Sequence, residues 1–408
     1  MSVRFTSSAS PSAPPRATEA RETLRERILS LLAAPDPARF DALALDVFRY
    51  QAAYNPVYGQ YLDCLRCRPD TVTDLRRVPF MPIGFFKQHT ILTAGAVPQL
   101  TFASSGTTNQ QVTSRHHVAD PMLYDAVCTQ IFEQTYGPLA NFHILALLPS
   151  YLERNNSSLV YMVQRFMERS NSTESGFFLD NFDELTSRLR QLTAHPDGRR
   201  VLLIGVTFAL LGWAGPRQAG SRRGTARQAG RSESDDALSW LGGLAGTSVP
   251  GTAVPSLVVM ETGGMKGRRQ ELLREEVHAL LTERLGVAAI HSEYGMTELL
   301  SQAYSAGNGV FRPSATLRIY LRDINDPFAL HPDPYTPAAE RQTGNRRSGS
   351  RQTGERRTGG INVVDLANLD SCSFIETQDL GQYTADGGFR VIGRFDNSDI
   401  RGCNLMVV

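Results

Sequence analysis

Three short, continuous apolar runs constrain the fold of this chain more than any other feature of its sequence. They are Phe142–Pro149, Arg200–Phe208 and Ser256–Glu261. A run of this length without polar alternation is typical of a strand that is buried on both faces of a parallel sheet. Helical or glycine-rich sequence follows each run. Strands that alternate with helices predict an α/β fold with a largely parallel sheet.

Apolar residues at helical spacing predict helices over residues 17–35, 37–54, 121–136 and 157–166. At 408 residues the chain has room for more than one structural unit. Residues 1–16 are rich in Ser, Pro and Ala and have no hydrophobic core segment, so we expect a disordered tail rather than a signal peptide.

Two segments, 214–236 and 338–359, are rich in Arg, Gln, Gly, Ser and Thr and have no apolar periodicity. We interpret them as low-complexity insertions in surface loops, which add little loop-closure entropy. A role in RNA binding is the alternative, but no aromatic residues are interleaved with the arginines. The net charge of +1 also argues against a nucleic-acid partner. No apolar run approaches the roughly 20 residues of a membrane span.

The five cysteines are scattered and odd in number, which argues against a disulfide framework and favours a reducing, cytoplasmic location. Cys64 and Cys67 form a CxxC pair without a second pair or nearby histidines. We expect the two cysteines to lie on a helix surface or to form a half-buried pair rather than a zinc site.

The loop at Phe102-Ala-Ser-Ser-Gly-Thr-Thr108 follows the apolar run Val97–Phe102. Glycine lets the backbone approach a ligand closely, while hydroxyl groups and successive N–H groups can bind an anion. Ser104, Ser105, Gly106, Thr107 and Thr108 are therefore candidates for phosphate binding. No Gly-Lys-Ser/Thr follows, so the loop is not a Walker A motif, and an ordinary turn is the alternative.

Two further stretches follow predicted buried strands. Met260-Glu-Thr-Gly-Gly-Met-Lys-Gly267 places Gly263 and Gly264 where α/β sheets bind ligands, and a flat ring can lie against glycine backbone. Ser292-Glu-Tyr-Gly-Met-Thr-Glu298 combines an aromatic ring, a hydroxyl group and a carboxylate. Tyr294 can stack on a base, Thr297 can contact a phosphate and Glu298 can hold Mg²⁺, unless Glu298 is only a first-turn helix residue.

Two stretches near the end of the sequence complete the set. Phe374-Ile-Glu-Thr-Gln-Asp-Leu-Gly381 places Asp379 after a predicted strand and before a glycine, where a carboxylate can accept from two ribose hydroxyls or simply stabilise a β-turn. Ile392–Asn404 contains the pattern Gly393-Arg394-x-Asp396 followed by Gly402, which is the more specific of the two.

These five stretches, in this order, resemble the motifs of the adenylate-forming superfamily of acyl-CoA ligases and luciferases. Within it, the chain is most similar to the LuxE-type acyl-protein synthetase family, with the phenylacetate–CoA ligases as near relatives. The resemblance covers residues 17–408 apart from the two insertions. It implies the large-domain fold of adenylate-forming enzymes, layered α/β with mostly parallel sheets, over 17–392. Residues 393–408 would form the hinge and a truncated C-terminal domain.

The resemblance also implies roles for individual residues. Ser104–Thr108 would hold the phosphates of ATP, and Thr297 would contact the α-phosphate. Glu298 would bind Mg²⁺. Gly263 and Gly264 would lie beside adenine with Tyr294 stacked on it. Asp379 would bind the ribose with Arg394 close by, and Asp396 would lie at the hinge.

The chain departs from the superfamily pattern in one respect: no lysine follows Gly402, although relatives carry a catalytic lysine in their C-terminal domain. Lys87 and Lys266 are the lysines nearest to the motifs. Cys403 resembles the acyl-accepting cysteine of the LuxE-type family, and a thiolate attacks an acyl-adenylate readily. A buried structural cysteine at 403 is the alternative. We expect Cys372 to lie in a strand of the core.

The sequence therefore predicts an ATP- and Mg²⁺-dependent ligase that converts a carboxylic acid, by resemblance a fatty acid, into acyl-AMP and passes the acyl group to Cys403. The expected partners are that acid and an acyl-CoA reductase-like protein or acyl carrier. A CoA ligase of the phenylacetate type and a non-catalytic acyl- or nucleotide-binding subunit are the alternatives.

Overall fold

The structure is a computed structural model that describes residues 15–104, 113–148, 156–215, 238–241, 256–263, 272–335 and 358–395. The chain divides into two compact units. Unit 1 consists of residues 1–130, 297–301 and 313–408, and unit 2 of residues 131–296 and 302–312. No helix in the described ranges has the length and apolar character needed to cross a bilayer.

Unit 2 is built on a six-stranded sheet with the order β5-β4-β6-β7-β8-β9. The strands are β4 (Phe142–Leu147), β5 (Gly176–Phe178), β6 (Arg200–Val206), β7 (Leu257–Thr262), β8 (His291–Tyr294) and β9 (Ala303–Ser305). Every pair is parallel except β8–β9. All residues of β4, β6 and β7 are buried, which confirms the three strands expected from the apolar runs.

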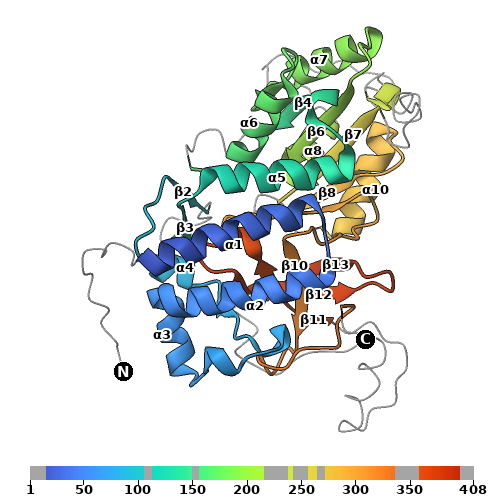
Figure 1. The fold of residues 1–408 in the computed structure, drawn as a ribbon. Helices are drawn as coiled ribbons and strands as arrows, with labels where there is room; N and C mark the ends of the chain where they lie inside the picture. Colours follow the sequence, from blue (N-terminus) through green and yellow to red (C-terminus); the bar gives the residue numbers. More distant parts are fainter. Residues whose placement is uncertain are drawn as a thin grey trace. The chain divides into compact units, whose positions relative to one another are not determined.

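Helices pack on this sheet (Figure 1). They are α6 (Ser158–Ser170), α7 (Phe182–Ala194), α8 (Thr207–Ala214) and α10 (Arg274–Leu285), with short 3₁₀ helices η3 (Leu139–Asn141) and η4 (Ser239–Leu241). Phe166 of α6 contacts Phe132, which also contacts Phe142 of β4. The strand expected over 200–208 is two residues too long, because α8 begins at Thr207.

Unit 1 contains a five-stranded sheet and a two-stranded sheet. The larger sheet has β1 (Met81–Pro82), β12 (Phe374–Tyr383), β11 (Thr358–Asp365) and β10 (Leu317–Arg322) in that order, with β13 (Phe389–Arg394) paired to β12. Only β1–β12 is parallel. Strands β2 (Leu100–Ala103) and β3 (Arg115–Val118) pair antiparallel. The α/β class is confirmed, and the parallel pairing is concentrated in unit 2.

The helices of unit 1 begin at prolines in several places. They are α1 (Pro15–Ala33), α2 (Pro37–Tyr54), α3 (Pro56–Cys64) and α4 (Phe85–Gln88), with η1 (Pro69–Thr71), η2 (Leu75–Arg77) and η6 (Leu366–Asn368). Helix α5 (Pro121–Tyr136) starts in this unit. The helix expected over 37–54 is confirmed, and the Asp36 side chain caps it.

Side chains link the helices of unit 1 to each other and to the sheet. Figure 1 shows α1 and α2 side by side, and the Arg27–Asp46 ion pair of 2.8 Å joins them. Phe374 of β12 contacts the rings of Phe48 in α2 and Tyr58 in α3. These aromatic contacts place α2 and α3 against the five-stranded sheet.

Several predicted boundaries change in the structure. Residues 15 and 16 belong to α1, so the expected tail over 1–16 is two residues too long. Residues 358 and 359 begin β11 and residue 214 ends α8, whereas 216–236 and 338–357 of the expected insertions lie outside the described residues. Cys372 is buried as expected, but it precedes β12 and does not lie in a strand.

Candidate active site

The neck of the predicted phosphate loop is closed by two serines of unit 1. The Ser104 amide donates to the Ser114 carbonyl at 3.0 Å, and the Ser114 amide donates to Ser104 Oγ at 3.0 Å. Ser104 directly follows β2, and Ser114 directly precedes β3, so the two strands hold the ends of the loop together. Ser105, Gly106, Thr107 and Thr108 lie outside the described residues.

Glu298 lies beside this neck, because its carboxylate accepts a hydrogen bond from the Ser114 side chain. It is buried, with 6% of its surface exposed. Burial raises the pKa of Glu298 above its ordinary value, while the Ser114 hydrogen bond and the positive charges of Arg394 and Lys87 act in the opposite direction. Unit 1 thus brings together a buried acid, a loop neck and two cations from four separate parts of the sequence.

The segment Thr297–Ser301 is held in unit 1 by side chains from three other elements, β3, β11 and η6. His116 Nδ1 lies 3.0 Å from the Thr297 carbonyl oxygen, and Asn368 Nδ2 donates to the Glu298 carbonyl at 2.8 Å. Asp365 Oδ2 accepts from the amides of residues 300 and 301 at 2.8 and 2.9 Å. The backbone on both sides of Glu298 is therefore fixed by hydrogen bonds.

Asp379 and Arg394 form an ion pair, with 3.0 Å between Arg394 Nε and Asp379 Oδ1. They are paired across β12 and β13. The expectation that Asp379 follows a strand is wrong: it lies inside β12, where antiparallel pairing continues to Tyr383. The β-turn alternative for Asp379 is excluded for the same reason. The Arg394 side chain is 69% exposed and remains accessible to a ligand.

The two predicted adenine-binding elements that the structure describes both belong to unit 2. Gly263 follows β7 with a φ of 69°, and its carbonyl accepts from Thr207 Oγ1 at 3.0 Å. That φ lies in the left-handed region, which favours glycine. Tyr294 ends β8, and its buried ring packs against Phe311 with centroids 5.8 Å apart. Gly264 lies outside the described residues.

The sequence reasoning missed a pair of buried acids, Glu261 and Glu293, on adjacent strands of unit 2. Glu261 Oε2 accepts from Thr207 Oγ1 at 2.8 Å, and Oε1 lies 3.1 Å from Arg274 Nε. Burial favours a raised pKa for Glu261, but hydrogen bonds from His278 and other groups and the charge of Arg274 bring its pKa below the ordinary value.

The pKa of Glu293 is shifted in the opposite direction to that of Glu261. It accepts a hydrogen bond from the Thr262 hydroxyl. Burial, with the neighbouring charge of Glu261, raises its pKa to about 7. The available signal was Glu261 inside the largely apolar run of β7, since charged residues are seldom fully buried without a partner, whereas the polar sequence of β8 gave no comparable signal for Glu293.

Three predicted residues near the end of the sequence, Cys403, Asp396 and Gly402, lie outside the described residues. Their assigned roles remain predictions. Lys266 also lies outside the described residues. Lys87 is described and lies on α4.

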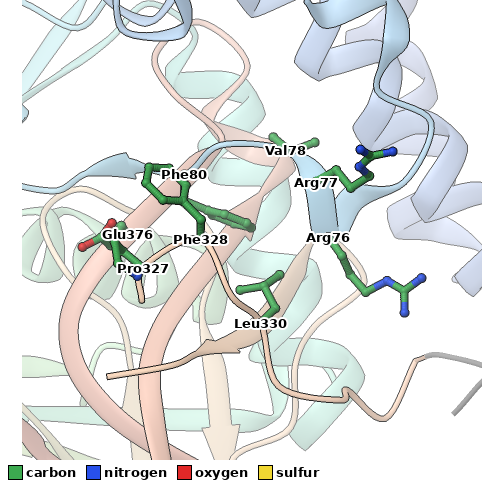
Figure 2. A pocket seen from close by; sticks show the side chains of 8 residues that line it. All are labelled: Arg76, Arg77, Val78, Phe80, Pro327, Phe328, Leu330 and Glu376. Atoms are coloured by element: carbon green, nitrogen blue, oxygen red, sulfur yellow. The ribbon is translucent and has the colours of Figure 1, made fainter. Parts of the chain in front are cut away.

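Two cavities in the described part of unit 1 are lined by residues other than those predicted for the site. Figure 2 shows a cavity of about 90 Å³ near η2 and β1, lined by residues that include Phe80, Phe328 and Glu376. A second cavity of about 420 Å³ is lined by α1, the 93–97 segment and Asp120. Neither cavity contains Ser104, Glu298 or Asp379 in its lining.

Comparison with protein-family models gives no match, and a search of curated proteins finds no similar sequence. Solved structures do match. An open conformation of 2-hydroxyisobutyryl-CoA ligase in complex with 2-HIB-AMP and CoA aligns with a TM-score of 0.57 and 12% identity, over 89% of this chain and 76% of the ligase. The same ligase in its postadenylation state gives 0.55 and 10%, over 89% and 69% of the two chains.

Other matched structures are less similar. The luciferase-like enzyme from the mealworm Zophobas morio aligns with a TM-score of 0.42 and 11% identity, over 74% of this chain and 59% of that enzyme. At these identities a structural likeness establishes the fold and not the activity. The chain therefore has the fold of adenylate-forming ligases, as the resemblance implied.

Proposed function

We propose that this chain activates a carboxylic acid with Mg·ATP. A carboxylate oxygen of the acid attacks the α-phosphorus, the bond between that phosphorus and the bridging oxygen breaks, and pyrophosphate leaves with the electron pair. The products are acyl-AMP and pyrophosphate. The observation that carries this proposal is the buried Glu298 beside the neck of the Ser/Gly/Thr loop, with Lys87 and Arg394 in electrostatic reach.

In this proposal the chain acts mainly by positioning and by charge neutralisation. Ser104 and the following loop residues Ser105–Thr108 bind the phosphates, and Thr297 contacts the α-phosphate. Asp379, fixed by Arg394, accepts from the ribose hydroxyls. The resemblance assigns adenine binding to Gly263, Gly264 and Tyr294, and that assignment remains a prediction.

The residues present fit Mg²⁺ at Glu298. Mg²⁺ is usually held by one or two carboxylates together with substrate phosphates, rather than by a complete cage of protein ligands. Within the described ranges no group of three or more His, Cys, Asp or Glu side chains is arranged to hold a metal ion by itself. A single buried carboxylate next to a phosphate loop is consistent with that mode, and the ion would neutralise charge on the phosphates.

The second step of the proposal transfers the acyl group to a thiol. By resemblance the thiol is Cys403, the acid is a fatty acid, and the final acceptor is an acyl-CoA reductase-like protein or a carrier. The Cys403 thiolate would attack the acyl carbonyl and AMP would leave. Transfer to CoA is the second candidate, because two of the matched structures of 2-hydroxyisobutyryl-CoA ligase are complexes with CoA.

Pyrophosphate release from ATP, measured with a panel of carboxylic acids of increasing chain length, tests the first step. We expect release with at least one acid and a loss of about 100-fold or more in Glu298→Gln, because a positioned phosphate or metal contact is removed. Glu376→Gln is the matched control, since Glu376 belongs to the same unit but lines a cavity that does not include Glu298. Equal rates in the two variants, or ATP binding without release for any acid, would contradict the proposed activity and favour a binding subunit.

Radiolabelled acid separates the two acceptors. Label that stays on the protein, is released by hydroxylamine and is lost in Cys403→Ser but not in Cys64→Ser supports acyl transfer to Cys403. An absolute requirement for CoA together with an unaffected Cys403→Ser variant supports the CoA ligase instead. Cys64 is a suitable control because it is an exposed free thiol.

A further inference from the structure

One buried histidine, His116 of β3, makes a hydrogen bond to the backbone at the predicted phosphate and metal contacts. It is 1% exposed. Its Nδ1 lies 3.0 Å from the Thr297 carbonyl oxygen, and its Nε2 lies 2.9 Å from Ser371 Oγ. The ring of Phe86, next to Lys87 on α4, meets the imidazole edge to face with centroids 5.5 Å apart.

The two contacts determine which ring nitrogen carries the proton. A carbonyl oxygen can only accept, so Nδ1 must be the donor to Thr297. Nε2 then has no proton and accepts from the Ser371 hydroxyl at 2.9 Å. The only other acceptor of that hydroxyl among the described residues, the Asn368 carbonyl oxygen, is farther away at 3.5 Å. Burial lowers the pKa of His116 to about 4, so the ring is neutral at physiological pH. The neutral His116 ring therefore has a single N–H group, at Nδ1, which donates to the Thr297 carbonyl oxygen.

The Thr297 carbonyl belongs to the peptide unit that joins Thr297 to Glu298. A peptide unit is planar, so a hydrogen bond to this oxygen restrains ψ of Thr297 and φ of Glu298 together. The next peptide unit is restrained by the hydrogen bond from Asn368 to the Glu298 carbonyl. The direction of the Glu298 side chain thus depends on two neighbouring contacts, of which His116 supplies the first.

We propose that His116 is a positioning residue for acid activation: its Nδ1–H fixes the peptide between Thr297 and Glu298, so that the Thr297 hydroxyl and the Glu298 carboxylate stay oriented for the nucleotide phosphates and Mg²⁺. This inference rests on the proposed function. His116 itself touches neither the nucleotide nor the acid in this scheme.

A matched pair of variants separates this role from simple core packing. The amide nitrogen of asparagine can replace Nδ1 as a donor to Thr297. The amide nitrogen of glutamine can take the place of Nε2, where it donates to Ser371 Oγ while the Ser371 hydroxyl turns its own proton to the Asn368 carbonyl. His116→Asn therefore keeps a donor for Thr297 and loses the Ser371 contact, while His116→Gln does the reverse. Each variant loses one of the two hydrogen bonds, so thermal unfolding should change to a similar extent in both.

In pyrophosphate release we expect kcat of His116→Asn to stay within a few-fold of the wild-type value. We expect kcat of His116→Gln to fall about 10- to 100-fold, the usual effect of losing a contact that orients a ligand-binding residue, with a smaller change in KM for ATP. Equal kcat values for the two variants, whether both reduced or both unchanged, would overturn the positioning role.

Two measurements do not depend on catalysis. Nitrogen-15 NMR of the wild-type imidazole should show the proton on Nδ1, and a proton on Nε2 would overturn the inference. Hydrogen exchange of the Glu298 amide should be faster in His116→Gln than in His116→Asn, and equal exchange would contradict the proposal. If the wild-type protein releases no pyrophosphate with any acid, the proposed function fails, while these two readouts still decide whether His116 fixes the segment.

Discussion

The pH dependence of stability should change in a defined way when Glu293 is replaced by glutamine. Glu293 is 7% exposed, and its pKa rises from 4.5 in an unfolded chain to about 7 in the folded protein. The folded state therefore binds a proton more strongly than the unfolded state, and the free energy of unfolding falls as the pH rises between these values. Compared with a group that stays protonated, Glu293 lowers the free energy of unfolding by about 0.8 kcal/mol at pH 5 and by about 3.3 kcal/mol at pH 8.

Glutamine has the same shape, keeps an oxygen that can accept from the Thr262 hydroxyl, and does not titrate. The stability of Glu293→Gln minus that of the wild type should therefore increase by about 2.5 kcal/mol between pH 5 and pH 8. This difference isolates Glu293. The pKa values of His116 and His291 are lowered to about 4, so they increase stability as the pH rises from 4 to 6.5, but they contribute equally to both proteins.

Urea unfolding followed by tryptophan fluorescence suits this measurement, because Trp213 and Trp240 are the two tryptophans of the chain and both belong to unit 2, as Glu293 does. Glu261→Gln is the matched control on the neighbouring strand. The pKa of Glu261 is lowered, so its stabilising contribution is present at neutral pH and is lost on acidification, and its removal should destabilise the protein at pH 8 more than at pH 4. A Glu293→Gln difference that is flat within 0.5 kcal/mol, on the order of experimental error, would refute the assigned pKa.

Two further changes test the site and the fold. Lys87→Met removes a positive charge that lowers the pKa of Glu298, so pyrophosphate release should fall about 10-fold or more. Lys87→Arg should restore part of the rate. Unchanged release in Lys87→Met would exclude a role of Lys87 in catalysis. Gly359→Ala would place a Cβ 2.5 Å from the Arg322 carbonyl oxygen, which should cost about 1–3 kcal/mol in urea unfolding. At Gly84 a Cβ meets no atom within 4 Å, so Gly84→Ala is the control, and equal stabilities would show that 359 tolerates a side chain.

Gly359 also illustrates where composition misled the prediction. The residues before it are rich in arginine and glycine, and this composition led to the prediction of a low-complexity insertion that extends to residue 359. In the structure, Thr358 and Gly359 pair with Gln382 and Gly381 of β12. A strand that lacks apolar side chains at its start is recognised only through its partner.

Asp379 shows the same limit in the predicted site. The local sequence Gln-Asp-Leu-Gly is typical of a turn, yet β12 continues through it because β11 and β13 pair on both sides. That pairing places Arg394 directly opposite Asp379. Selecting Asp379 from its motif was possible, but its ion pair and its position inside a strand depend on contacts between residues far apart in the sequence.

Local patterns alone determined the buried strands β4, β6 and β7 and the bounds of α2 and α5. A continuous apolar run has to be buried, and Asp36 followed by Pro37 specifies a helix start. The motif order alone also indicated the adenylate-forming fold. Only the tertiary structure decided that Glu298 is buried beside Ser114, that His116 directs its proton to Thr297, and that Glu261 and Glu293 titrate in opposite directions. Burial and charge depend on which distant residues surround a group, and a linear sequence does not specify those neighbours.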